Sequence, residues 1–154
     1  MTQEEKELLS KDLSSRLFYG VICHANKINI DGELLFVNKL YNILALYCDN
    51  AIGKFESCPI NDIRPYLRPM SSMTEEERRE FSVFIGKTEV YVQQIRLDAD
   101  SMANPIIGGN KCVYWGLFDR CIDWLNKKMF DYRGLIEKGL AIEAPEGMYN
   151  LEKK

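Results

Sequence analysis

The sequence lacks the long apolar run and the excess of basic side chains that mark membrane and nucleic-acid-binding proteins. No stretch approaches the roughly 20 apolar residues that a membrane-spanning helix needs. The first seven residues are polar and acidic, so no secretory signal is predicted and the expected location is the cytoplasm. Residues 1–70 carry 8 basic and 9 acidic side chains, and residues 71–154 carry 12 and 14. Neither part favours binding driven by nucleic-acid phosphates.

Cysteine and histidine are too few and too scattered for the usual thiol and metal sites. The five cysteines are an odd number at irregular spacing, with no C-x-x-C pair, so neither a disulfide framework nor a zinc site is predicted. We interpret them as small apolar core residues. His24 is the only histidine, and Cys23 beside it would point to the opposite face of a strand. His24 is therefore interpreted as an ordinary strand-end residue before a turn, and no cofactor or metal is expected.

Two polar stretches resemble catalytic motifs only in part. Asp98 and Asp100, with the acidic run 75–77, could hold Mg²⁺, which leaves a small metal-dependent nuclease or hydrolase as a minority hypothesis. A polar loop and a solvated helix start explain the same residues without chemistry. Residues 108–111 (GGNK) lack the spacing of a phosphate-binding loop, so a plain turn is predicted there.

The 154 residues, 46% of them hydrophobic, are enough for one domain or one domain with an appendage. Thr2 and Glu5 form the pattern of a capping box, which predicts a helix over residues 3–16. Leu9, Leu13 and Leu17 recur every four residues and would form its buried stripe.

Residues 17–58 have the alternation and turn residues of four or five short strands. Asp31-Gly32 fits a two-residue hairpin turn. Residues 35–47 also suit a helical period, but a strand is the preferred interpretation. Short strands joined by tight turns favour an antiparallel sheet curled into a small barrel, with an SH3-like barrel as the most specific expectation.

The rest of the chain alternates helices with irregular segments. Residues 61–69 contain two prolines and predict an extended connector. Thr74 and Glu77 form a second capping box, which predicts a helix to about residue 84. The next predicted elements are a strand over 88–97, a loop over 98–110 and a helix over 116–129. The tail is predicted to consist of turns around one short strand at 140–142. The predicted fold class is α+β, with residues 1–70 and residues 71–154 as two parts of one compact unit.

Three stretches carry a resemblance to a known family. They are residues 65–77 (PYLRPMSSMTEEE), residues 123–126 (DWLN) with 130–149 (FDYRGLIEKGLAIEAPEGMY), and the opening residues 11–21. They resemble a family of uncharacterised small proteins found in gut-bacterial genomes, their phages and mobile elements. The resemblance implies a phage or mobile-element context and no particular activity. Residues 86–114 do not share in it.

Six Arg, Tyr and Asp residues near the connector and the tail are the candidate binding residues. They are Arg64, Tyr66, Arg68, Asp131, Tyr132 and Arg133. Arg and Tyr are enriched as anchors of protein interfaces, and they also suit single-stranded nucleic acid. The structural alternative is that Asp131 pairs with a nearby Arg and that Tyr66 packs between prolines.

Because no catalytic set is evident, the leading hypothesis is a non-enzymatic protein that binds a protein partner. The alternative is a nucleic-acid-binding accessory protein that uses the face of the barrel. The partner and the oligomeric state are not fixed by these residues.

Overall fold

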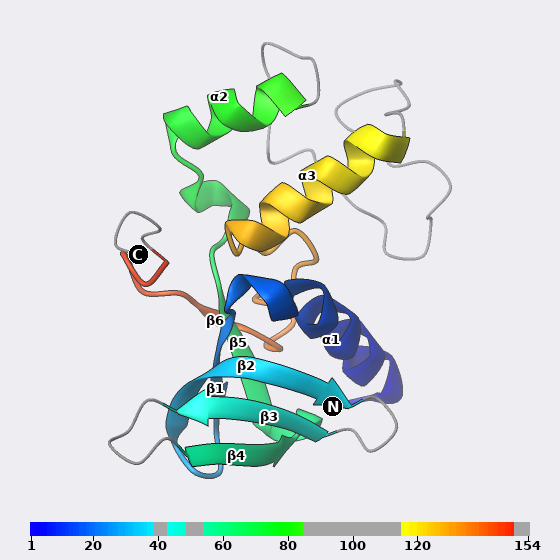
Figure 1. Cartoon of the computed structure of the whole chain (residues 1–154), viewed down its shortest axis with the longest axis vertical. Coiled ribbons are helices and arrows are strands. Elements are labelled where there is room, and N and C mark those ends of the chain that lie inside the picture. The colour runs from blue at the N-terminus through cyan, green and yellow to red at the C-terminus, as the bar shows by residue number, and fades with distance from the viewer. Residues whose placement is uncertain (39–42, 49–53, 85–114, 150–154) are drawn as a thin grey trace. The chain divides into compact units, whose positions relative to one another are not determined.

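The structure is a computed structural model that describes residues 1–38, 43–48, 54–84 and 115–149 (Figure 1). It has the predicted α+β composition. The chain divides into two compact units. The sheet unit comprises Met1–Leu67 and Leu135–Lys154, and the helical unit comprises Arg68–Gly134. Within the described ranges, no helix combines the length and the apolar character needed to cross a membrane.

The N-terminal helix α1 (Gln3–Arg16) forms as predicted. The Thr2 hydroxyl accepts a hydrogen bond from the Glu5 amide, and the Glu5 carboxylate accepts one from the Thr2 amide. This reciprocal cap satisfies backbone donors that would otherwise lack a partner. The helix buries Leu9 and Leu13 completely.

Five strands of the sheet unit form an antiparallel run: β1 (Ile22–Ala25), β2 (Ile30–Asn38), β3 (Ile43–Cys48), β4 (Lys54–Pro59) and β5 (Ile63–Leu67). β6 (Ile142–Glu143) joins β5 in parallel, so the order is β4-β3-β2-β1-β5-β6. For the described part of residues 35–47, β2 and β3 confirm the strand interpretation over the helical one. The expected barrel is not found, because no ladder joins β4 to β6 in the described chain and the sheet is open. An SH3-like barrel is likewise not supported.

The prediction of a hairpin turn at Asp31-Gly32 is wrong. Both residues lie inside β2, where Asp31 is the register partner of His24. The turn falls at residues 26–29 because the buried Asp62 stabilises it from another part of the chain. The Asp62 carbonyl accepts a hydrogen bond from the Asn26 amide at 2.9 Å, and its carboxylate accepts one from the Lys27 amide at 3.0 Å. A tertiary contact thus overrides the local preference of Asp-Gly for a turn.

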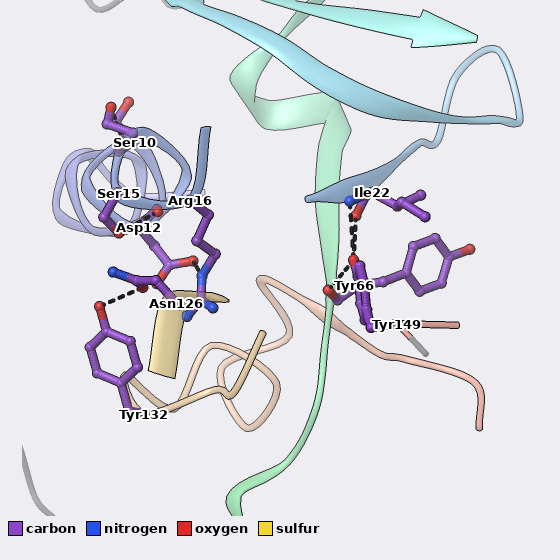
Figure 2. Close-up of polar contacts among 10 residues, drawn as sticks. Ser10, Asp12, Ser15, Arg16, Ile22, Tyr66, Asn126, Tyr132 and Tyr149 are labelled. Atoms are coloured by element: carbon purple, nitrogen blue, oxygen red, sulfur yellow. Dashed lines mark hydrogen bonds and ion pairs between the residues drawn. The ribbon is translucent and has the colours of Figure 1, made fainter. Parts of the chain in front are cut away.

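The C-terminal segment returns to the sheet unit and is held there by backbone and side-chain contacts. The Ala144 amide donates to the Leu67 carbonyl at 2.8 Å, which extends the pairing of β6 with β5. Figure 2 shows the Tyr149 hydroxyl between two strands. It accepts a hydrogen bond from the Ile22 amide at 3.0 Å and donates one to the Tyr66 carbonyl at 2.9 Å.

The helical unit is built on α2 (Glu75–Phe84) and α3 (Trp115–Lys127). The predicted capping box at Thr74 and Glu77 is present. The core of this unit is aromatic, with the rings of Trp124 and Phe130 stacked at a centroid distance of 5.7 Å. Its buried members are Met73, Phe81, Cys121, Trp124, Leu125, Phe130 and Tyr132.

Asn126 of α3 is buried although it is polar. Its side-chain oxygen accepts a hydrogen bond from the Tyr132 hydroxyl at 2.9 Å (Figure 2). The expected strand over 88–97 and the expected loop over 98–110 lie outside the described residues.

Candidate functional site

The six predicted binding residues fall in different units. Arg64 and Tyr66 lie on β5 in the sheet unit. Arg68 and residues 131–133 lie in the helical unit, where the Arg68 backbone pairs with the segment after α3. The two groups are therefore considered separately.

Arg68 forms an ion pair that holds the helical unit together. Its guanidinium donates two hydrogen bonds to the Glu77 carboxylate, at 2.7 and 2.8 Å, and lies 4.3 Å from the centroid of the Phe130 ring. Burial alone would raise the pKa of Glu77. The hydrogen bonds from Arg68 and from the Thr74 backbone, together with the charges of Arg68 and Lys128, lower that pKa overall. Arg68 thus serves the fold of this unit.

The segment at residues 131–133 is mostly internal. Asp131 and Tyr132 are buried, and the Asp131 amide donates to the Arg68 carbonyl at 2.7 Å. The Arg133 guanidinium lies 4.8 Å from the centroid of the Tyr132 ring. Asp131 and Tyr132 therefore lie inside the unit, and of the three residues only Arg133 is partly exposed. The pairing of Asp131 with an Arg side chain stays a prediction.

The sheet unit presents a polar face on β1, β2 and β5. Successive strand residues point to opposite faces, and the burial follows this rule. Cys23 and Ala25 are buried on β1, whereas the intervening His24 is partly exposed. Arg64 is the register partner of His24 on β5 and is exposed. No hydrogen bond or ion pair joins Arg64 to another of the described residues.

His24, Asp31 and Tyr66 form a hydrogen-bonded cluster on this face. His24 Nδ1 lies 2.7 Å from Asp31 Oδ1, and the Tyr66 hydroxyl donates to the same oxygen at 3.1 Å. An ionised carboxylate only accepts hydrogen bonds, so Nδ1 carries the proton of this contact. Burial and, next, the hydrogen bond to Asp31 raise the pKa of Tyr66, which keeps the phenol protonated.

Sequence reasoning missed this cluster because it placed the hairpin turn at the wrong residues. The sequence nevertheless contained the information needed to predict the His24–Asp31 pair. A four-residue turn at 26–29 makes Ala25 and Ile30 neighbours, and it then makes His24 and Asp31 neighbours on the same face. Only the position of the turn was needed to find the pair.

The cluster can orient a ligand or hold a proton, but the thiol next to it in the sequence, that of Cys23, does not face it. Cys23 lies on the buried face, and its pKa is raised, first by burial and then by the charge of Asp12. Across the described parts of the chain, no group of three or more His, Cys, Asp or Glu residues could hold a metal ion. The Asp98 and Asp100 pair of the nuclease hypothesis and the 108–111 motif lie outside the described residues.

Phe18 is the second unusual feature of the sheet unit. It lies in a short 3₁₀ turn, Leu17–Tyr19, between α1 and β1, and 91% of its surface is exposed. The turn ends at Gly20, whose φ of +69° is a conformation that glycine adopts without strain. The backbone thus holds a large apolar side chain in solvent, where it contributes almost no burial to this chain.

Comparison with known proteins adds no family to these observations. No protein-family model matches the chain, and neither a curated protein nor a solved structure matches it.

Proposed function

We propose that this protein is a non-enzymatic interaction protein that binds a protein partner through the sheet unit. The observation that carries the proposal is the 91% exposure of Phe18 in an ordered turn. Burying a phenylalanine at an interface contributes about 1.5–3 kcal/mol. Arg64 and Tyr66 on the same unit are residue types that often supply the remaining binding energy at protein interfaces.

The charge of the sheet unit favours a protein partner over nucleic acid. Its sequence contains 10 basic and 13 acidic side chains, a net charge of −3, whereas the helical unit contains 10 of each. Nucleic-acid binding draws most of its affinity from Lys and Arg that neutralise phosphates. Phe18 could stack on a base, but the negatively charged sheet unit that carries it would repel the phosphate backbone of a nucleic acid. We therefore place nucleic-acid binding second.

The setting follows from the family resemblance of the three sequence stretches. We propose that the partner is encountered in the cytoplasm of a bacterium that carries a related phage or mobile element. Gene neighbourhood is the simplest check of this part, since adjacent replication, packaging or lysis genes would indicate the process that the partner serves.

A comparison of partner capture by three forms of the full chain tests the main proposal. The forms are wild type, Phe18→Ala and Ile28→Ala, in which Ile28 is a matched exposed apolar residue, 42% exposed, in the turn before β2. We expect a captured protein whose affinity falls at least about ten-fold in Phe18→Ala and is unchanged in Ile28→Ala. Neither variant should unfold, because neither side chain is buried.

Two results would contradict the proposal. One is a partner that binds Phe18→Ala as well as it binds wild type. The other is the absence of any protein partner combined with a shift of labelled DNA or RNA in gels at low salt, which would support the nucleic-acid alternative instead.

A further inference from the structure

The exposed face of β1, β2 and β5 holds His24 in a fixed orientation beside Arg64, an arginine that pairs with none of the described residues. The Asp31 carboxylate accepts a hydrogen bond from His24 Nδ1 at 2.7 Å. It accepts a second one from the Tyr66 hydroxyl at 3.1 Å. These contacts leave the second ring nitrogen, Nε2, without a hydrogen bond to any of the described residues. The His24 side chain is 21% exposed, so the imidazole ring is partly accessible from solvent.

Arg64 supplies a second donor at the same place. It is the register partner of His24 on the neighbouring strand, so both side chains rise from the same face. Residues directly opposite each other in antiparallel strands have Cβ atoms about 4.5–5.5 Å apart. An imidazolium, whose Nε2 carries a proton, and a guanidinium at that separation can each donate to one oxygen of the same carboxylate.

The acidic side chains on this face do not prevent an anion from binding between His24 and Arg64. Asp31 already accepts hydrogen bonds from His24 and Tyr66. Glu33 lies two residues farther along β2, opposite Ile22, and its carboxylate lies against Gly20, with Oε1 3.2 Å from the position that a Cβ would take there. Gly20 precedes β1, so this carboxylate approaches the end of the strand away from His24. With His24 protonated, two positive charges face one neighbouring negative charge.

We propose that His24 and Arg64 form a binding site for a carboxylate of the protein partner, an Asp or Glu side chain or a chain terminus. His24 takes up a proton as the carboxylate binds, with Asp31 stabilising the imidazolium through Nδ1. This inference rests on the proposed function for the identity of the partner as a protein. A monoanion matches the local charge, whereas a phosphate dianion would place two negative charges beside the Asp31 carboxylate.

The single histidine makes a direct test possible in the full-length protein. The probe is N-acetylglutamate amide, which carries one carboxylate, and the readout is the NMR signal of the His24 ring. We expect a saturable shift in that signal and tighter binding at lower pH, because Nε2 must carry a proton to donate to the carboxylate. Sodium chloride at the same ionic strength should not reproduce the shift.

Two variants separate the specific site from general electrostatics. Arg64→Gln and Lys27→Gln each remove one exposed positive charge from the sheet unit. We expect Arg64→Gln to weaken carboxylate binding about five-fold or more and Lys27→Gln to leave it unchanged. Equal weakening in both variants would overturn the proposal. So would the absence of a saturable shift in wild type, or tighter binding of inorganic phosphate than of the carboxylate.

The outcome can be distinguished from failure of the proposed function. Loss of partner capture in Phe18→Ala together with no carboxylate binding would sustain the interaction protein and reject this site. Carboxylate binding that depends on Arg64, combined with no protein partner, would sustain the site and reject the proposed function.

Discussion

Replacing Tyr149 with phenylalanine should measure how strongly the C-terminal segment holds the sheet. The β1–β5 register pairs Cys23 with Pro65, and continuing it would bring Ile22 opposite Tyr66. The Tyr149 hydroxyl occupies that step of the ladder, accepting from the Ile22 amide and donating to the Tyr66 carbonyl. One hydroxyl therefore completes the contact between two strands and ties residue 149 to both.

The expected cost of the change follows from those two hydrogen bonds. Each contributes about 1 kcal/mol net, and a buried group that loses its partner costs about 1–3 kcal/mol. Tyr149 is only partly buried, so water can compensate in part. We expect Tyr149→Phe to lower the free energy of unfolding by about 2 kcal/mol in urea titration, and the midpoint of thermal unfolding by roughly 4–8 °C. Hydrogen exchange at the Ile22 amide should accelerate about thirty-fold.

Tyr66→Phe provides the matched control. Its hydroxyl donates to Asp31, whose side chain is 52% exposed, so its loss should cost less than about 1 kcal/mol. If Tyr149→Phe were as stable as Tyr66→Phe and the Ile22 amide exchanged at the wild-type rate, the argument for a hydroxyl-bridged ladder would be refuted.

The same residue predicts a loss of stability at alkaline pH. Burial is the main cause that raises the pKa of Tyr149 above its ordinary value. A raised pKa in the folded state means that the stabilisation is complete below the ordinary pKa, about 10 for tyrosine, and is lost as pH rises beyond it. Tyr149→Phe should show a smaller alkaline decline than wild type. The thiol of Cys23, whose pKa burial also raises, contributes a decline that remains in the variant.

Two further predictions concern one ion pair and one turn. Arg68→Ala should destabilise the helical unit by about 1–3 kcal/mol, because it leaves the partly buried Glu77 without its guanidinium; unfolding monitored by Trp fluorescence measures this. Since the pKa of Glu77 is lowered, its contribution should be present above the ordinary pKa and disappear as pH falls through the lowered one, and Glu77→Gln should lack that dependence. Gly20→Ala should cost about 1–2 kcal/mol from its positive φ, plus the displacement of the Glu33 carboxylate. Gly139→Ala is the control that measures only the cost of the positive φ, because nothing around Gly139 contacts the added Cβ within 4 Å. Equal losses of stability in the two variants would mean that the contact with Glu33 costs nothing.

Features that depend on neighbouring residues in the chain could be predicted from the sequence. Both capping boxes form where Thr precedes Glu by three residues, and α1 and α3 span nearly the expected segments. The opposite faces of Cys23 and His24 also follow from strand geometry alone. In each case the stabilising partners lie within four residues or on one element, so no tertiary information is needed.

Features that depend on distant residues could not be predicted in this way. The first hairpin turn is set by Asp62, more than 30 residues away from the turn that it stabilises. Asn126 looks like a solvent-facing residue of α3 until the Tyr132 hydroxyl supplies its partner. The position of the turn decides which residues of β1 and β2 lie opposite each other, so this one tertiary contact concealed the His24–Asp31 pair.

The same distinction explains why the six sequence candidates differ in what they can do. Arg68, Asp131 and Tyr132 looked like binding residues because Arg, Asp and Tyr are common at interfaces, yet each makes contacts within the helical unit. A guanidinium already bound by a carboxylate has less to offer a partner, because the existing pair would have to break first. Arg64 has no such competitor among the described residues, and its strand neighbour His24 is already oriented by Asp31. A binding site needs donors that folding has positioned and left available to a partner, and for this reason we propose that binding occurs through the sheet unit.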